Sequence, residues 1–246
     1  MAPDRVSATA TSIEILEALR RVGPAGVTDI ATAVGGSKAN VHKHLATLEA
    51  AHFVRSTNGK YQLAHRFLEF AMAAKEREPV YREGVDNLSK LADVTGTTTL
   101  LVVQEGLEGV YLHTVPAGGR NDPVGLEGTR APLPELPGGL AILSCYGPEK
   151  RRALVEAALE EDARVDAVLD RLGTIQQESV VVSDSRHASG PEEILAPVIT
   201  DDGAPAGALG LYRPVTGTDS VRVETDLRKL VRNTANTVSN RLSLTQ

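Results

Sequence analysis

The sequence predicts a protein of class α+β that is built from two domains. The first third alternates short helical stretches with glycine turns and ends in a β-hairpin signal. The remaining two thirds mix strands with inserted helices, and the charge changes sign between the two parts. A chain of 246 residues is long enough for two such domains, each with its own core.

Composition and charge narrow the class of protein. Hydrophobic residues make up 41% and charged residues 24% of the chain, which disfavours wholesale disorder and a coiled-coil rod. Residues 1–75 carry nine Lys/Arg and six Asp/Glu, net +3, whereas residues 76–246 carry seventeen and twenty-six, net −9. Opposite charge in the two parts suggests a basic interaction module attached to an acidic body.

Signals for a membrane or for secretion are missing from the sequence. No apolar run reaches the roughly 18 residues that span a bilayer, and residues 1–5 lack the apolar stretch of a signal peptide. We therefore expect a cytoplasmic protein without a membrane partner. The single Cys145 excludes an internal disulfide and any multi-cysteine zinc site.

Two helices are expected before residue 37. The first starts at Thr11, with Glu14 in the capping-box position, and stops at Gly23. Its apolar positions at helical spacing are Ile13, Leu16, Leu19 and Val22. The second takes Thr28 as its N-cap and is cut off by the glycine pair at residues 35–36.

A third helix, capped by Ser37, is the candidate recognition helix. Its apolar stripe is Val41, Leu45 and Leu48. Two short helices joined by a tight glycine turn are typical of a helix-turn-helix, whose second helix enters the DNA major groove. With the stripe packed inward, the helix presents non-acidic side chains suited to base edges and phosphates. These DNA-binding candidates are Ser37, Lys38, Ala39, Asn40, His42 and Lys43.

A β-hairpin follows the third helix. Residues 53–57 and 60–63 flank Asn58 and Gly59, which favour the type I′ turn because both central residues need φ > 0. This hairpin would be the wing of a winged helix, with Arg55 and Lys60 placed to contact phosphate. The alternative is a packing domain whose basic residues only form a solvated face.

Residues 36–49 together with residues 59–63 resemble the winged helix of the IclR family of transcriptional regulators. The resemblance continues to the C-terminus. It implies a winged helix-turn-helix DNA-binding domain over residues 1–65, a linker helix over residues 66–80, and an effector-binding and oligomerisation domain over residues 81–246. It also implies a double-stranded DNA operator, a small-molecule effector and a homodimer or tetramer as partners.

The remaining elements suit one antiparallel sheet with flanking helices. Residues 66–91 form one or two helices broken near Pro79, and a glycine turn at residues 105–106 separates the first strand pair. Strands are expected over residues 97–103, 110–115, 180–182, 194–199 and 206–212, and helices over 138–145, 148–160, 163–177 and 220–242. The effector domain of the resembled family is similar, with a GAF-like fold.

Two segments match landmarks of the family's effector pocket, and both depart from them. Leu136 stands where the family usually has Thr. Around residues 182–206, Ser185 and Arg186 replace an acidic pair after Asp184, and Glu193 replaces a frequent Cys. The effector-binding candidates are Arg130, Leu136, Gly138, Gly139, Leu140, Asp184, Ser185, Arg186 and Glu193.

The ligand expected at these residues is an organic acid, a sugar acid or a related metabolite at the amino end of the 138–145 helix. Its backbone N–H groups favour an anion, and Gly138 and Gly139 would let a ligand approach closely. A Glu193 that faces inward requires a hydroxyl or amine on the ligand. Alternatively, Arg186 and Glu193 pair with each other or with water at the surface.

We expect no enzymatic activity and no cofactor or metal. Cys145 with His113 or His187 is the only nucleophile–base candidate, and Cys145 follows an apolar helical run typical of a buried residue. Residues 42 and 44, both His, lie two apart on one helix and so face differently, and residues 201–202 read as a solvated turn. Nucleotide-binding glycine motifs are absent.

Two alternatives to an effector-controlled regulator stay open. One is an effector-independent DNA-binding dimer whose C-terminal domain only oligomerises, which a lack of any ligand-induced change in melting temperature would indicate. The other is an enzyme carrying an appended winged helix, which turnover would reveal.

Overall fold

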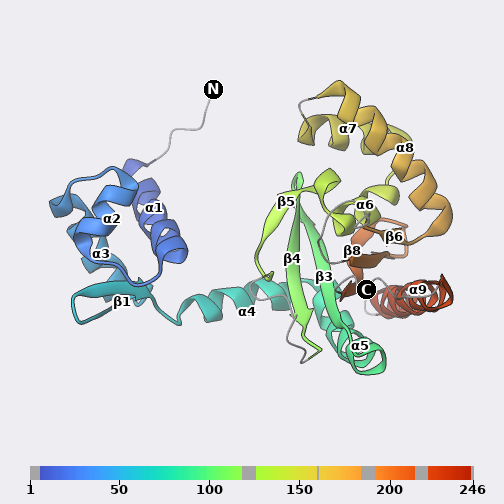
Figure 1. Cartoon of the computed structure of the whole chain (residues 1–246), viewed down its shortest axis with the longest axis horizontal. Helices are drawn as coiled ribbons and strands as arrows, with labels where there is room; N and C mark the ends of the chain where they lie inside the picture. The colour runs from blue at the N-terminus through green and yellow to red at the C-terminus, as the bar shows by residue number, and fades with distance from the viewer. Residues whose placement is uncertain (1–5, 118–125, 160, 184–191, 214–220, 245–246) are drawn as a thin grey trace. The chain divides into compact units, whose positions relative to one another are not determined.

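The structure of the chain, a computed structural model, separates into two compact units, Met1–Ala74 and Lys75–Gln246 (Figure 1). It describes residues 6–117, 126–159, 161–183, 192–213 and 221–244, without the side chains of residues 162, 163 and 221–224. The first unit is helical with a hairpin, and the second is an antiparallel sheet with helices. The predicted α+β class is therefore confirmed.

The N-terminal unit packs three helices around one small core. They are α1 (Ser7–Val22), α2 (Val27–Val34) and α3 (Lys38–Ala50). Ile15, Ile30 and Leu45, one from each helix, are fully buried in it. Gly23 and Gly35 end the first two helices with φ of 71° and 66°, a conformation that only glycine adopts at little cost.

Both helix starts before residue 37 differ from the sequence prediction. α1 begins at Ser7, so Thr11 lies inside the helix and its hydroxyl donates back to the Ser7 carbonyl at 3.1 Å. α2 begins one residue before Thr28, because the backbone N–H of Gly26 donates to the Asp29 carboxylate at 3.3 Å. Threonine hydroxyls bond inside helices as well as at caps, so a capping pattern alone does not locate the first residue.

The buried face of α1 also differs from the predicted stripe. Ile13 and Val22 are 56% and 58% exposed, whereas Ile15 and Ala18 are fully buried together with the predicted Leu19. The predicted stripe thus included two residues that lie on the exposed side of the helix. The two partner helices decide which of several similar apolar positions is covered.

The hairpin predicted after α3 is present as β1 (Val54–Thr57) and β2 (Lys60–Leu63). Asn58 and Gly59 have φ of 52° and 73°, as a type I′ turn requires. Tyr61 of β2 exchanges backbone hydrogen bonds with Ala25 between α1 and α2, at 3.0 and 2.8 Å. The wing is therefore fastened to the helical core.

An aromatic cluster joins the start of α4 (Phe67–Arg77) to the N-terminal unit. The rings of Phe67 and Phe70 lie 5.2 and 5.3 Å from that of Phe53, and the guanidinium of Arg66 lies 5.1 Å from the Phe53 ring centre. Part of the apolar surface of the predicted linker thus covers its own domain.

The C-terminal unit is built on a six-stranded antiparallel sheet in the order β5-β4-β3-β8-β7-β6. Its strands are β3 (Thr98–Glu105), β4 (Glu108–Val115), β5 (Arg130–Pro132), β6 (Val181–Val182), β7 (Glu192–Ile199) and β8 (Pro205–Arg213). The sequence did not predict β5, because three residues are too few to show an alternating pattern. β3 and β8 meet at the centre although they are far apart in the chain.

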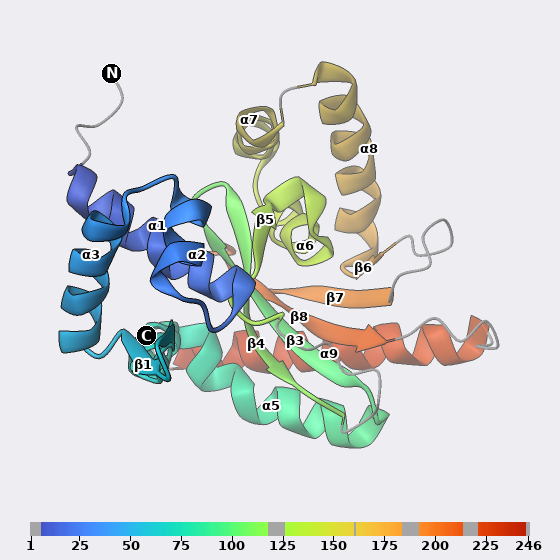
Figure 2. The ribbon, with the colours of Figure 1, turned by 60° about the vertical axis from the view of Figure 1, so that its left-hand side comes forward.

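Helices cover both faces of this sheet (Figure 2). α5 (Pro79–Thr95) and α9 (Val221–Leu244) cover one face, and α6 (Pro137–Ser144), α7 (Pro148–Ala158) and α8 (Asp162–Glu178) lie on the other. A 3₁₀ turn, η1 (Leu133–Glu135), leads into α6. Within the described residues, no helix is long and apolar enough to cross a membrane.

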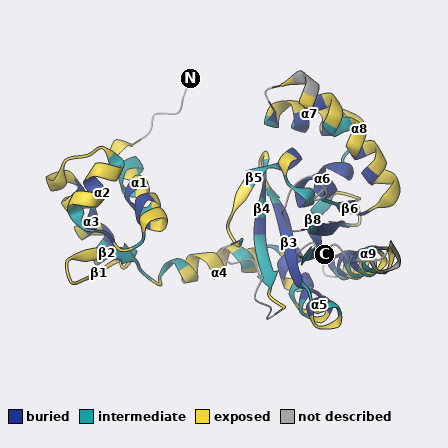
Figure 3. Cartoon of the chain, viewed as in Figure 1, coloured by how far each residue is buried: buried dark blue, intermediate teal, exposed yellow. Residues whose placement is uncertain are grey.

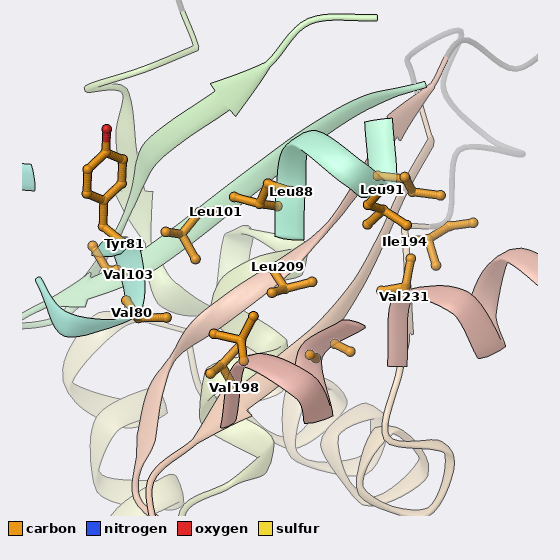
Figure 4. Packing of buried hydrophobic residues seen from close by; sticks show 14 of the residues in the cluster. Val80, Tyr81, Leu88, Leu91, Leu101, Val103, Ile194, Val198, Leu209 and Val231 are labelled. Atoms are coloured by element: carbon orange, nitrogen blue, oxygen red, sulfur yellow. The ribbon is translucent and has the colours of Figure 1, made fainter. Parts of the chain in front are cut away.

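The sheet is buried on both sides, which explains the unbroken apolar run of β3. Leu101 and Val103 pack on the α5 and α9 side with Leu209 of β8 (Figure 4). Leu100 and Val102 face α6 and α8. Strands that are covered on both faces read as continuous hydrophobic runs rather than alternating ones.

A shift in the register between β3 and β4 decides the direction of two side chains. Leu112 is the extra residue between Tyr111 and His113 on β4. Tyr111 joins the cluster on the α6 side, whereas the His113 ring packs edge-on against Tyr81 of α5, with the ring centres 5.2 Å apart. Positions 111 and 113, which would share a face in a regular strand, therefore face opposite sides of the sheet.

Candidate nucleic-acid interface and ligand site

The amino-terminal half of α3 forms an exposed polar surface. The Ser37 hydroxyl accepts the backbone N–H of Asn40 at 3.3 Å, which fixes the start of the helix. Val41, Leu45 and Leu48 turn into the core, as predicted. All six predicted DNA contacts of this helix are exposed: Ser37, Lys38, Ala39, Asn40, His42 and Lys43.

The two histidines of α3 face different directions. His42 is exposed, whereas His44 is half-buried with its Nδ1 2.9 Å from the Ser12 hydroxyl of α1. His44 therefore braces α3 against α1. No group of three His, Cys, Asp or Glu side chains that would hold a metal occurs in the described part of the chain.

The wing adds two exposed cations to this surface. Arg55 and Lys60 are both exposed, and Arg55 lies opposite Gln62 in the hairpin. The Glu49 carboxylate at the end of α3 accepts the backbone N–H of Ser56 at 3.1 Å. This bond holds the wing next to the helix that carries the other candidates.

The cations of α3 and the wing have no carboxylate partner among the residues that the structure describes. Among the described residues, none of Lys38, Lys43, Arg55 and Lys60 forms an ion pair. The described carboxylates of the unit therefore do not neutralise their charge. An external anion such as a phosphate can therefore pair with them.

The amino end of α6 is packed tightly against the sheet. A Cβ added at Gly138 would lie 2.7 Å from the Cβ of Val102, and one at Gly139 would lie 2.1 Å from the Leu133 carbonyl oxygen. Close packing against β3 and η1 therefore requires glycine at both positions, whether or not a ligand also approaches them. Pro137 occupies the first helical position, so the next free backbone donors are those of the two glycines.

Leu136 and Leu140 complete this end of α6. The Leu140 N–H donates to the Leu136 carbonyl at 2.9 Å, and both side chains belong to the apolar cluster between α6 and the sheet. A Cβ added at Gly109 of β4 would lie 2.8 Å from the Leu136 Cδ1. The side chain at position 136 is therefore a packing group.

Glu193 of β7 faces the interior rather than the surface. It is 8% exposed, and its Oε1 accepts the Tyr111 hydroxyl at 2.8 Å. The other carboxyl oxygen, Oε2, is buried without a hydrogen-bond partner among the described residues. The Glu193 backbone N–H donates to the Ser183 hydroxyl at 2.7 Å, which anchors this end of the strand.

Burial changes the acidity of this cluster. It raises the pKa of Glu193 from 4.5 to about 7, although the hydrogen bond from Tyr111 acts in the opposite direction. Burial and then the nearby Glu193 charge raise the pKa of Tyr111, and the same two causes raise the pKa of Tyr212. The carboxyl group of Glu193 therefore changes protonation near neutral pH, while both phenols stay neutral.

Arg130, another predicted effector residue, is engaged in ion pairs of its own. Arg130 is exposed in β5, where its guanidinium pairs with Glu105 and, at 3.0 Å, with Glu108. It is engaged at the edge of the sheet, whereas Glu193 is buried. Asp184, Ser185 and Arg186 lie outside the described residues.

Sequence reasoning missed a charged network at the end of α4. Lys75 Nζ and His113 Nδ1 lie 2.5 and 2.9 Å from the two carboxylate oxygens of Glu127. Burial lowers the pKa of His113, with Lys75 adding to this effect and Glu127 opposing it. Three separate chain segments supply these groups, so no local pattern reveals the network.

Cys145 has the environment of a packing residue. It is half-buried, its Sγ lies 3.6 Å from the Ala141 carbonyl oxygen, and burial raises its thiol pKa. Reactive cysteines show the opposite shift. His113, its suggested base, is engaged with Glu127.

Comparison with known proteins supports the helix-turn-helix interpretation of the N-terminal unit. Residues 11–57 match the family model of the IclR helix-turn-helix domain. The "Probable HTH-type transcriptional regulator ArcR" of Halobacterium salinarum is 25% identical over 251 residues, which cover 98% of this chain and 95% of that protein.

Solved structures share the fold over almost the whole chain. The IclR crystal structure of Thermotoga maritima superposes with a TM-score of 0.78 at 21% identity, covering 97% of this chain and 99% of that one. An IclR homologue of Microbacterium hydrocarbonoxydans, crystallised with 4-hydroxybenzoate, superposes with a TM-score of 0.77 at 17% identity, covering 96% and 98%.

Proposed function

We propose a role for each unit from the premise that this chain belongs to the IclR family of DNA-binding transcriptional regulators. The chain is a regulator and not an enzyme. In our proposal the N-terminal unit reads an operator, and the C-terminal unit oligomerises and binds a small-molecule effector. Because its partner is chromosomal DNA, we also place the protein in the cytoplasm.

The exposed cations of α3 and the wing, none of which forms an ion pair with a described residue, are the observation that carries the DNA-reading proposal. On α3, Asn40 suits adenine and Lys38 suits guanine in the major groove. On the wing, Arg55 and Lys60 suit phosphates, which position the unit without reading sequence. The acidic C-terminal part repels phosphate, so binding depends on this surface.

Footprinting on the DNA that flanks the gene tests operator binding. We expect a protected pseudo-palindrome, because one recognition helix reads too few base pairs to find a single site. With about six to ten phosphate contacts per dimer, the log–log dependence of affinity on salt should have a slope of roughly −5 to −9. A slope near zero would contradict a phosphate-dominated interface.

A second copy of the chain is the partner proposed for α4. Leu68 and Met72 of this helix are 64% and 47% exposed, and most of α4 is exposed in Figure 3. Apolar side chains grouped in this way favour self-association into a dimer or tetramer. Sedimentation at micromolar concentration should give at least a dimer, and Leu68→Glu should weaken it. A monomer in moderate salt would contradict the proposal.

The effector site proposed in the C-terminal unit lies on the α6 side of the sheet, around Glu193 and the amino end of α6. A buried carboxyl group with one oxygen that no described residue pairs supports a polar ligand there. The class of ligand is an organic acid, a sugar acid or a related metabolite. An IclR homologue crystallised with 4-hydroxybenzoate makes this acid one member of the first panel.

Thermal-shift and operator-binding assays with such a panel test the effector role. A binding metabolite should raise the melting temperature and change operator affinity. The Gly139 position is unsuitable for a blocking variant, because any side chain there meets the Leu133 backbone. If no metabolite changes melting temperature or operator affinity, the effector-independent dimer is the better description.

A further inference from the structure

We propose that the ligand of the C-terminal unit carries an ammonium group and that Glu193 binds this group through Oε2. This inference rests on the effector-binding role proposed above and names the ligand class of that site. It starts from one buried atom whose hydrogen-bonding capacity is unused.

The two oxygens of the Glu193 carboxyl group are not equivalent. Oε1 accepts the Tyr111 hydroxyl at 2.8 Å, whereas Oε2 is buried and has no partner among the described residues. Buried polar atoms are nearly always paired, and a carboxylate oxygen without a donor is costly. A ligand that donates to Oε2 removes this cost and gains a charge-assisted hydrogen bond.

The surroundings of Glu193 supply no positive charge from the described residues. Tyr111 and Tyr212 are the ionisable groups whose interaction with it is resolved, and both are neutral phenols. The next residue in the strand, Glu192, is already paired with Arg213. α6 contributes no charged side chain at all, because its sequence is entirely apolar or small.

This environment discriminates between ligand classes. An organic anion without a donor would bring a second negative charge to a carboxyl group that no described cation balances, unless Glu193 were protonated. An ammonium group supplies both the missing donor and the missing charge. Among small metabolites, primary amines and amino acids therefore fit Oε2 better than simple carboxylic acids.

The proposal predicts how the affinity for an amine depends on pH. Burial raises the pKa of Glu193 to about 7, so ammonium binding releases a proton from a carboxyl group that is partly protonated at neutral pH. Affinity for an amine should therefore rise about tenfold from pH 6 to pH 8. A carboxylate that binds the protonated form would show the opposite trend.

Matched ligand pairs on the full-length protein test the ligand class. Each pair shares a carbon skeleton and differs at the amine: β-alanine and propionate, serine and glycerate, tyrosine and 3-(4-hydroxyphenyl)propionate. The remaining amino acids and the common polyamines extend the panel. We expect at least one amine to raise the melting temperature, its amine-free partner to have no effect, and calorimetry to show tighter binding at pH 8 than at pH 6.

Two variants link a binding amine to Glu193. Glu193→Gln keeps the size of the side chain and removes its charge, and should weaken binding by about 10- to 100-fold. Asp201→Asn removes one charge from an exposed turn of the same unit and should change nothing. Tyr111→Phe leaves Oε2 in place and should keep the preference for amines, which controls for general damage to the cluster.

Three outcomes would overturn the inference. Amine-free acids that bind the wild type and Glu193→Gln alike would show that the effector role stands but that Glu193 does not select the ligand. Acid binding that strengthens at low pH would show that Glu193 acts as a protonated donor. A complete panel without any binding amine would refute the ammonium ligand, and operator affinity measured in parallel would still test the DNA-binding role separately.

Discussion

The two units keep their candidate functional groups in opposite environments. The eight predicted DNA contacts on α3 and the wing are all exposed, whereas Glu193 and Tyr111 of the C-terminal unit are 8% and 5% exposed. A DNA duplex is bound from the outside, so the side chains that contact it have to be exposed. A small molecule is selected best where water is excluded, because hydrogen bonds and charges are stronger there.

The two candidate sites depend on their hydrophobic cores in different ways. The outer surface of the first unit needs the core only to hold α3 in place. The Glu193 cluster of the second unit is itself part of the buried layer, so its protonation and its packing are coupled. Substitutions in the two units should therefore have different effects on stability, on its pH dependence and on DNA affinity.

The largest expected effect is on the core that holds α3. Leu45→Ala removes a fully buried side chain and should destabilise the N-terminal unit by about 2–5 kcal/mol. Hydrogen exchange resolved by segment should show the loss in residues 7–63 alone. Thr47→Ala, at an exposed position of the same helix, is the control and should stay within about 0.5 kcal/mol. Equal loss of protection in both units would contradict their separate cores.

The next effect concerns the pH dependence of stability in the second unit. The pKa of Glu193 is raised from 4.5 to about 7 on folding, so its neutral form is favoured in the folded state. Stability from this group is complete below pH 4.5 and is lost as pH rises through 7, by about 3 kcal/mol.

Glu193→Gln should remove this difference. Denaturant unfolding at pH 5 and pH 8 should show that the variant gains about 2.5 kcal/mol relative to the wild type between the two values. Asp201→Asn should follow the wild type at both. If the difference between variant and wild type is the same at pH 5 and pH 8, Glu193 is not buried in solution as described.

A smaller effect distinguishes base reading from phosphate contact on the outer surface. Asn40→Ala should cost about 1–3 kcal/mol on the operator and little on random DNA, because it removes a base contact. His42→Ala should behave similarly. Lys60→Ala should weaken binding to both DNAs alike and reduce the slope of affinity against salt by about 1. Equal effects of Asn40→Ala and Lys60→Ala on both DNAs would mean that α3 does not read the bases.

The smallest effect is at the cap of the recognition helix. Ser37→Ala removes the acceptor of the Asn40 N–H and should destabilise the N-terminal unit by about 1 kcal/mol. Ser37→Gly should cost only about a few tenths of a kcal/mol, because glycine also suits an N-cap. Thermal unfolding of both variants gives the comparison. An alanine variant as stable as the wild type would show that the cap contributes nothing.

Local patterns in the sequence determined most of the first unit. The stripe of Val41, Leu45 and Leu48 settles which side of α3 is outward, because a helix shows its periodicity within a few turns. The Asn58-Gly59 pair determines the wing turn, because a type I′ turn depends on φ > 0 at these two residues alone. The stripe of α1 was misplaced because several apolar positions compete for the core, and only the packing of α2 and α3 chooses among them.

The C-terminal site was decided by the tertiary structure. The order of the strands brings Tyr111 of β4 to Glu193 of β7 although two other strands lie between them. No local pattern predicts such a pair, and the register shift at Leu112 further separates the faces of Tyr111 and His113. The sequence singled out Glu193 as unusual, but its burial, its unpaired Oε2 and its raised pKa arise from distant segments that exclude water together.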